Sequence, residues 1–315
     1  MKRKNIPHIS ESENPASTGL DKKTSLQILR IINREDAKVA LAIRKVLPQI
    51  ARAVDLIVER LTLGGRLIYL GAGTSGRLGV LDASECMPTF GTDRVVGLIA
   101  GGPRALTHST EDAEDDPHRA VQDLKAIRLE SRDALVGIAA SGWTPYTLGG
   151  MRYAKRIGSA VIGVTSNPQS SVRQLAAVAI TPVVGPEVIA GSTRMKAGTA
   201  QKLVLNMLST ASMVRLGRVL SNRMINVQVR NRKLRRRACE ILAKAARVSR
   251  PVAARVLRQS GDQLPVALLM LWSKRARRES EAALKRGPSV AAVLRAAEME
   301  WKITSGLSRR RAQMR

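Results

Sequence analysis

Leu67-Ile-Tyr-Leu-Gly-Ala-Gly-Thr-Ser-Gly-Arg77 is the stretch that decides the fold. Its first four residues, 67–70, are apolar and predict a buried strand, and its three glycines let the chain turn sharply into a short helix. Gly73, the hydroxyls of Thr74 and Ser75, and the N–H groups at the start of that helix can bind phosphate oxygens. An ordinary strand-to-helix turn is the alternative interpretation of a single loop of this kind.

The loop does not match the known nucleotide-binding signatures closely. A Walker loop ends in Gly-Lys-Ser or Gly-Lys-Thr, which is missing here. The spacing of the glycines gives only a loose match to the dinucleotide fingerprint. Because the loop is rich in hydroxyls, it suits a small phosphorylated ligand better than a dinucleotide.

A second loop of the same type follows another apolar run. Residues 134–140 are apolar and lead into Ser141-Gly-Trp-Thr-Pro-Tyr-Thr147, after which a helical pattern runs to Ile157. In an open parallel sheet, loops that follow strands meet at the carboxyl edge, where such folds bind ligands. Ser141, Gly142 and Thr144 are therefore further candidates for phosphate ligands.

The spacing of the apolar runs indicates the fold class. Continuous apolar strands are covered on both faces, and helices between them favour parallel crossover connections. We expect a three-layer, doubly wound α/β domain with a five-stranded, mostly parallel sheet. The strands are expected at 67–70, 95–100, 134–140, 160–165 and 178–184, with a helix at 43–61 interrupted by Pro48 and a long helix at 193–216.

The composition changes after residue 220. Arg- and Ala-rich helical patterns, broken at Pro251, at 261–265 and at Gly287-Pro288, predict a small C-terminal helical domain. We therefore divide the chain into a polar segment at 1–24, an α/β domain at 25–220, a helical domain at 221–305 and a basic tail at 306–315.

Cysteine content and hydropathy indicate the cellular compartment. Cys86 and Cys239 are the only cysteines and lie far apart in the sequence, which is compatible with a reducing cytosol. No apolar run approaches the roughly 18 residues that a membrane span needs, and no apolar signal region follows the polar start. The expected location is the cytoplasm.

The formal net charge is +28, and it is unevenly distributed. Residues 221–315 contain 24 Lys and Arg against 6 Asp and Glu. Clustered basic residues are typical of proteins that bind nucleic acids, so a polyanion- or nucleic-acid-binding protein is one alternative function. Aromatic residues make up only 2% of the chain, and no zinc-finger or RNA-recognition motif is present, so we expect incidental polyanion affinity from the basic C-terminal region.

Five motifs in order resemble those of the N-acetylmuramic acid 6-phosphate etherases, which carry a sugar-isomerase-type (SIS) phosphosugar-binding domain. The resemblance covers roughly residues 14–219. The glucokinase regulatory protein shares the domain and is a related protein with which the chain could be confused. The motifs are Gly71-Ala-Gly-Thr-Ser-Gly-Arg-Leu-Gly-Val-Leu-Asp-Ala-Ser-Glu-Cys86, Val96-Gly-Leu-Ile-Ala-Gly-Gly102, Ala113-Glu-Asp115, Ala139-Ala-Ser-Gly-Trp-Thr-Pro-Tyr146 and Gly191-Ser-Thr-Arg-Met-Lys-Ala-Gly-Thr-Ala-Gln-Lys202.

The resemblance implies a lyase that needs no cofactor. Its substrate would be N-acetylmuramic acid 6-phosphate, whose D-lactyl ether is eliminated before water is added, giving N-acetylglucosamine 6-phosphate and D-lactate in peptidoglycan recycling. It implies that Glu114 is the base at C2 and that Glu85 is the acid at the leaving oxygen, a division of labour that two carboxyl groups can supply. It also implies a homodimer and a small ubiquitin-associated-like C-terminal domain. No metal is expected, because His8, His108, His118 and the two cysteines show no ligand spacing.

Alternative interpretations of the glutamates stay open at this level. Glu85 could interact with a helix dipole, and the acidic run at 111–116 could be a solvated helix start, in which Asp115 could be catalytic or structural. Lys196 and Arg194 could neutralise substrate charge or decorate a helix. Trp143 occupies a position where the family usually carries a cation, and Met87 one where proline is common. A non-catalytic, sugar-phosphate-sensing regulatory protein is a further alternative function.

Overall fold

The computed structural model describes residues 9–108, 110–227, 229 and 232–313. The chain divides into two compact units. The first consists of Met1–Ser84 and Arg94–Ser212, and the second of Glu85–Asp93 and Met213–Arg315.

Within the described residues, five strands form the parallel sheet of the first unit, in the order β2-β1-β3-β4-β5. This confirms the predicted sheet. The run at 178–184 yields only a three-residue strand, because Pro182 lies two residues after its end and has no N–H to donate to a neighbour. The strands are β1 (Leu67–Gly71), β2 (Val95–Ile99), β3 (Ala134–Ile138), β4 (Ala160–Val164) and β5 (Val178–Ile180).

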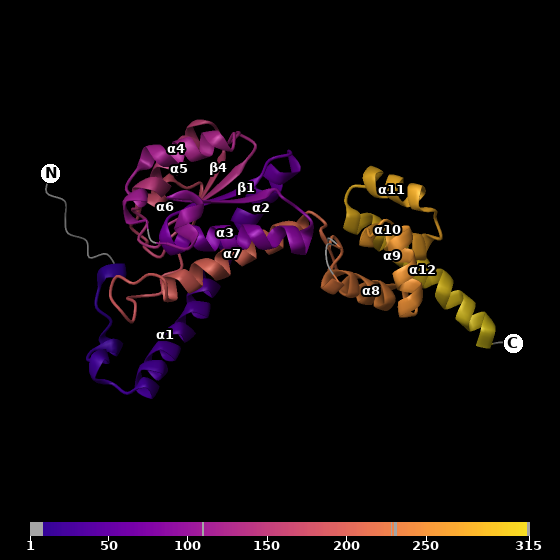
Figure 1. The fold of residues 1–315 in the computed structure, drawn as a ribbon, viewed down its shortest axis with the longest axis horizontal. Helices are drawn as coiled ribbons and strands as arrows, with labels where there is room; N and C mark the ends of the chain where they lie inside the picture. Colours follow the sequence, from indigo (N-terminus) through magenta and orange to yellow (C-terminus); the bar gives the residue numbers. More distant parts are fainter. Residues whose placement is uncertain (1–8, 109, 228, 230–231, 314–315) are drawn as a thin grey trace. The chain divides into compact units, whose positions relative to one another are not determined.

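Helices cover both faces of this sheet and make the predicted three layers (Figure 1). Apolar side chains of α4, α5 and α6 pack against Ile68, Leu70 and Leu135 on one face. On the other face, the hydroxyl of Tyr69 donates to Asp82 of α3 at 2.9 Å and to the carbonyl of Leu205 in α7 at 3.4 Å. The helices are α2 (Leu47–Thr62), α3 (Gly73–Phe90), α4 (Pro117–Ala126), α5 (Pro145–Arg156), α6 (Ser171–Leu175) and α7 (Lys196–Arg215).

The helical region before the sheet is longer than expected. A further helix, α1 (Ser25–Lys45), begins at a capping box in which the Thr24 hydroxyl accepts from the N–H of Gln27. It ends just before α2, whose first turn contains Pro48, so the predicted interruption is confirmed. Short 3-10 helices precede and follow: η1 (Ile9–Glu11), η2 (Pro15–Ser17), η3 (Leu20–Lys22), η4 (Gly102–Leu106) and η5 (Glu111–Glu114).

The turn after β1 is tighter than the sequence suggested. We expected a loop followed by a short helix, but α3 begins at Gly73 and runs for 18 residues, so Thr74 and Ser75 lie in its first turn. The close approach depends on Gly76, where a Cβ atom would lie 2.6 Å from the carbonyl oxygen of Gly71. Only glycine leaves room for the helix to start this close to the strand end.

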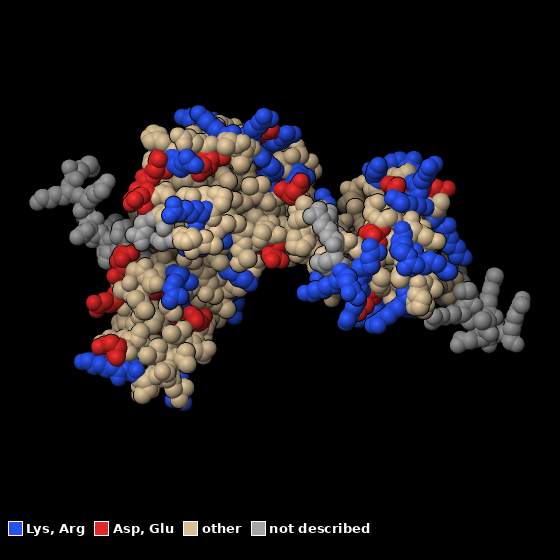
Figure 2. Space-filling view, in the orientation of Figure 1, with Lys and Arg blue, Asp and Glu red and all other residues tan. Residues whose placement is uncertain are grey.

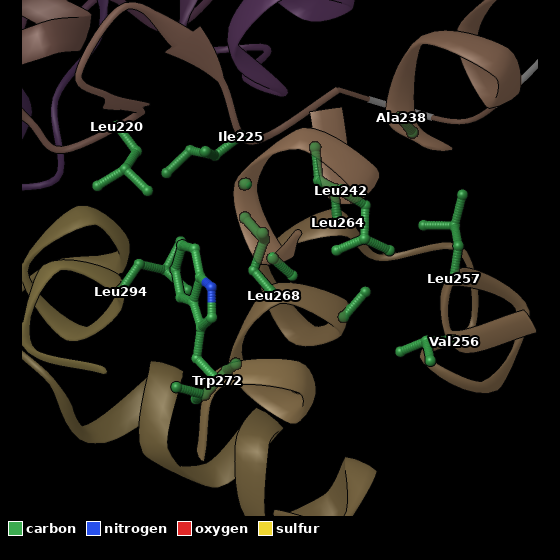
Figure 3. Close-up of a cluster of buried hydrophobic side chains, with 14 of the residues drawn as sticks. Leu220, Ile225, Ala238, Leu242, Val256, Leu257, Leu264, Leu268, Trp272 and Leu294 are labelled. Atoms are coloured by element: carbon green, nitrogen blue, oxygen red, sulfur yellow. The ribbon is translucent and has the colours of Figure 1, made fainter. Parts of the chain in front are cut away.

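The second unit is a helical bundle with a core of its own, accompanied by the short antiparallel pair β6 (Val219–Leu220) and β7 (Arg223–Met224). Trp272 lies among Leu242, Leu268 and Leu294 in this core (Figure 3). The helices are α8 (Arg232–Ala246), α9 (Arg250–Gln259), α10 (Leu264–Ser273), α11 (Arg277–Arg286) and α12 (Val290–Gln313). None of the helices in the described part of the chain is long and apolar enough to span a bilayer.

Replacing Gly97 of β2 with Ala should destabilise the first unit. The added Cβ would lie 2.5 Å from the Cα atom of Val80, and that backbone cannot rotate away as a side chain could. Overpacking of this kind costs about 1–3 kcal/mol, measurable as a lower free energy of unfolding in urea. An unchanged unfolding curve would mean that α3 and β2 are not in close contact.

Candidate functional site

The two hydroxyl-rich loops lie next to each other because β1 and β3 are neighbours in the sheet. β2 comes between them in the sequence but pairs on the far side of β1, so the strand order reverses at this point. Gly71, the last residue of β1, is in register with Ile138, the last residue of β3. The carboxyl edge at such a reversal is where open α/β sheets bind ligands.

The first loop presents the amino-terminal end of α3. Gly73 is exposed and has a φ of 51°, and Thr74 is half-buried. Ser75 is buried, and its hydroxyl donates to Oε1 of Gln201 in α7 at 3.0 Å. The first N–H groups of a helix have no partner within the helix, so the start of α3 offers donors for an anion.

The second loop has a geometry that only glycine permits at its centre. Gly142 has a φ of 77°, and a Cβ there would lie 2.2 Å from the Cβ of Ser170. The hydroxyl of Ser141 accepts from the N–H of Trp143 at 3.4 Å, which leaves the hydroxyl hydrogen able to point elsewhere. Thr144 is the N-cap of α5, and its side chain makes no capping hydrogen bond. This helix start is therefore a second source of uncapped donors.

The two candidate acids both lie on exposed positions. Glu85 is on α3, within the segment Glu85–Asp93 that belongs to the second unit. Glu114 is the last residue of η5, in the first unit. The chain before η5 is held by Arg77 of α3, whose guanidinium donates to the carbonyls of Ala105 at 3.0 Å and His108 at 3.1 Å.

The acidic run around Glu114 combines candidate functional residues with a helix cap. The Asp116 carboxylate accepts from the N–H groups of His118 at 2.8 Å and Arg119 at 3.1 Å, so it caps α4. Asp115, between Glu114 and this cap, is exposed. An open pocket adjoins the run, lined by Gly101, Arg104, Thr110, Asp112, Ala113, Asp116 and Arg119.

Lys196 takes part in a buried ion pair that sequence reasoning missed. Its ammonium group lies 2.6 Å from Oε2 of Glu35 in α1, and the two side chains are 1% and 2% exposed. Asn14 donates to the same carboxylate at 2.9 Å and to the carbonyl of Pro186 at 3.0 Å, and Lys38 pairs with its other oxygen. Lys196 is therefore neither an exposed residue of a helix surface nor available to neutralise substrate charge. Its ion pair links α7 to α1 and to the amino-terminal segment.

The start of α7 is closed to anions by a carboxylate of the protein itself. Glu187, which is 1% exposed, accepts from the N–H groups of Lys196 at 3.0 Å and Ala197 at 2.9 Å. A negative charge at a helix start neutralises the positive end of the helix dipole. The contrast with α5 indicates that an anionic ligand is better accommodated by the loops after β1 and β3 than by α7.

A second buried carboxylate fixes α3 against α7. Asp82, 6% exposed, accepts from Tyr69, from Nδ2 of Asn206 at 2.6 Å and from the hydroxyl of Ser209 at 3.2 Å. These bonds hold the middle of α3, and the contact between Ser75 and Gln201 holds its first turn. The partners in α7 could not be read from local sequence, because they lie 124–127 residues after Ser75 and Asp82.

Neither a metal site nor a cysteine pair is found among the described residues. No group of three or more His, Cys, Asp and Glu side chains in this part of the chain could hold a metal ion. Neither Cys86 nor Cys239 is part of a disulfide.

The chain is similar to known proteins over most of its length. It is 57% identical over 265 residues to proteins named N-acetylmuramic acid 6-phosphate etherase from Yersinia pestis (strain Pestoides F) and Yersinia pseudotuberculosis serotype O:1b (strain IP 31758), covering 84% of this chain and 90% of each relative. A family model described as the glucokinase regulatory protein N-terminal SIS domain matches residues 49–155. Among solved structures, a candidate phosphosugar isomerase from Bacteroides fragilis shares the fold, with a TM-score of 0.50 and 23% identity over 61% of this chain and 91% of that one.

Acid should weaken the first unit through Glu35. Burial by itself would raise the pKa of Glu35, but hydrogen bonds from Lys196, Lys38 and Asn14 outweigh burial and lower the pKa from 4.5 to about 2. The stability that this carboxylate contributes is therefore complete above about pH 4.5 and is lost as the pH falls towards 2. The pKa shift corresponds to about 3 kcal/mol of stability. Urea unfolding between pH 7 and pH 3 would measure the fall in the free energy of unfolding.

The matched comparison uses two Glu-to-Gln variants. Glu35→Gln removes the titrating group, so the free energy of unfolding of this variant should fall less steeply with acid than that of the wild type. Glu59→Gln changes an exposed carboxylate of α2 and should follow the wild type. If the free energy of unfolding depended on pH in the same way in wild type and Glu35→Gln, Glu35 would not be the group that weakens the first unit in acid.

Proposed function

Because the chain belongs to the N-acetylmuramic acid 6-phosphate etherases, we propose that it cleaves the D-lactyl ether of N-acetylmuramic acid 6-phosphate. The products would be N-acetylglucosamine 6-phosphate and D-lactate, which places the enzyme in the recycling of cell-wall amino sugars. The 57% identity supports this proposal most directly, and the two adjacent loops after β1 and β3 give it a physical basis.

We propose that these two loops hold the sugar phosphate. Donors from the first turn of α3, at Gly73, Thr74 and Ser75, and from the Ser141, Gly142 and Thr144 loop would bind the phosphate oxygens. Because the hydroxyl of Ser75 already donates to Gln201, its backbone N–H is the better donor to the phosphate. Anchoring the phosphate would restrict the motion of the sugar and bring its C2 and C3 atoms to the acids.

We propose that Glu114 and Glu85 divide the chemistry. The Glu114 carboxylate would take the proton from C2 of the open-chain sugar, the C3–O bond to lactate would break, and Glu85 would protonate the departing oxygen. Glu85, now a carboxylate, would then remove a proton from a water molecule while the oxygen of that water adds to C3. The proton held by Glu114 would return to C2. Atoms and charges balance over the two steps, and each glutamate returns to its starting state.

Replacing either acid by its amide should stop the reaction. We expect Glu85→Gln and Glu114→Gln to lower kcat for D-lactate release by at least about a hundredfold, the lower range for lost acid–base catalysis, while sugar-phosphate affinity changes little. Lactate release and equilibrium binding of N-acetylglucosamine 6-phosphate would be measured for each variant. Glu59→Gln, an exposed carboxylate on α2, is the control and should keep wild-type turnover. Near-native rates in both active-site variants would refute the assignment.

The match to the regulatory SIS domain supports a second candidate function. It covers residues 49–155, which include the first loop, the second loop and both glutamates. A non-catalytic sensor would bind sugar phosphates and change its affinity for a protein partner without releasing lactate. The same lactate assay separates this candidate from the etherase.

We propose that the enzyme acts as a homodimer and that α1 contributes to the interface. One face of α1 packs on the rest of the first unit through Val39, Ala42 and Ile43. The opposite third of the helix carries three leucines that are more than half exposed, and a helix that is apolar on two sides needs a second partner. These residues are Leu26 at 57%, Leu29 at 61% and Leu41 at 52% exposed.

Charge on this face should separate the subunits. Leu29→Glu together with Leu41→Glu should shift the molecular mass measured by light scattering from dimer to monomer, because burying two carboxylates in an apolar interface is costly. The control is Leu63→Glu, at a leucine that is also 61% exposed but lies just after α2. A dimer that survives both leucine changes in α1 would place the interface elsewhere.

We also propose a cytoplasmic location, because neither cysteine forms a disulfide, and a helical accessory domain. The domain would extend from about residue 221 to 305, with a basic tail after it. Support comes from the separate core of the second unit, which includes Trp272 and Leu294.

A further inference from the structure

Helix α8 has two faces of opposite character. Its buried side chains are Ala238, Leu242, Ala245 and Ala246, which recur at intervals of three and four and join the core of the second unit. Cys239, Ile241 and Ala243 flank this stripe and are partly buried against the same core, so only the opposite face of the helix is exposed to solvent.

The face opposite this stripe is almost entirely basic. Glu240 is the one acidic residue among the described positions of α8. Its carboxylate forms ion pairs with Arg236 at 3.2 Å and with Arg250 of α9 at 3.6 Å. Among the described side chains, Lys233, Arg237 and Lys244 form no ion pair with a carboxylate, so their charge is not compensated locally. The exposed basic face consists of Lys233, Arg236, Arg237 and Lys244 of α8, with Arg247 directly after the end of the helix.

We propose that the basic face of α8 binds the phosphate backbone of duplex nucleic acid without regard to base sequence. A 15-residue helix is about 22 Å long, and a duplex carries about one negative charge per 1.7 Å of its axis, so the row of cations meets many phosphates. Figure 2 shows Lys and Arg over much of the visible face of the unit that contains α8–α12, which extends the positive surface beyond one helix.

Single strands fit this unit less well than duplexes. Binding of single strands relies on exposed aromatic rings on which bases stack. Among the described residues of the unit, Phe90 and Trp272 are 6% and 4% exposed. Trp301 is half-buried, packs on Trp272 with ring centroids 6.5 Å apart, and lies under the guanidinium of Arg247 at 5.9 Å. Phosphate contacts are therefore the main interactions that this surface offers.

A lipid surface also fits α8 less well. A basic helix that binds membranes inserts its apolar face between the lipids. In α8 that face is already buried in the core, with Ala238 and Leu242 both 0% exposed. Duplex phosphates need only the basic face, which leaves the packing of the helix unchanged.

The test compares two charge-reversed variants of the full-length protein with the same change in net charge. The first carries Lys233→Glu, Arg237→Glu and Lys244→Glu on α8. The control carries Lys125→Glu, Arg152→Glu and Lys155→Glu, which are exposed positions on α4 and α5. Affinity for a random-sequence 30-base-pair DNA duplex would be measured by fluorescence anisotropy between 50 and 300 mM salt.

We expect the α8 variant to lose at least about tenfold in affinity and to show a shallower dependence of log Kd on log salt, by about 2–3, as three lost phosphate contacts require. The control should lose less than threefold. Equal losses in both variants would show that overall charge, not α8, drives binding, and would overturn the proposal. So would tighter binding of the wild type to phosphatidylserine vesicles or to single-stranded DNA than to the duplex.

Folding and catalysis provide the internal checks. Far-UV circular dichroism and thermal unfolding should match the wild type. If the Glu variant is destabilised, the corresponding triple Gln variant, which adds no like-charge repulsion along α8, replaces it and should lower the salt dependence by the same amount. D-lactate release should be the same in wild type and variants, so failure of the duplex-binding proposal and failure of the etherase proposal give different results.

Discussion

The pairing of β1 with β3 is the constraint on which the candidate site depends. These strands are separated in sequence by β2, and their adjacency brings the loops after Gly71 and Ile138 to one edge of the sheet. The close start of α3 adds to this effect, because Gly76 lets the first turn of the helix contact the end of β1. Two helix starts then face the same region, and both can donate N–H groups to an anion.

Helix α7 stabilises this edge through buried polar contacts. Lys196 pairs with Glu35, Gln201 accepts from Ser75, and Asn206 donates to Asp82. A buried charge without a partner is costly, so each of these contacts specifies one arrangement of α7 against its neighbours. This edge of the sheet is thus stabilised by residues of α7 that do not belong to the candidate site.

The success of sequence-based prediction varied with how local the responsible interactions are. The five apolar runs predicted the strands, because a strand covered on both faces needs continuous apolar residues. Pro48 predicted the break between α1 and α2, because proline suits the first turn of a helix. The tight start of α3 was missed, since it depends on the space beside Gly71 and Ile99. Neither role considered for Lys196, neutralising substrate charge or decorating a helix, anticipated its buried pairing, because its partner Glu35 is 161 positions away.

Local sequence patterns were enough to predict the strands, the two hydroxyl-rich loops and the excess of basic residues after position 220, and the family resemblance of the motifs supplied the acidic candidates Glu85 and Glu114. These features follow from local composition, turn chemistry and the order of motifs. Only the tertiary structure decided the order of the strands, the burial of Lys196 with Glu35, the capping of α7 by Glu187 and the division of α8 into a buried and a basic face. These depend on contacts between segments distant in the chain, and the free energy of such contacts comes from burial and pairing that no local window of sequence contains.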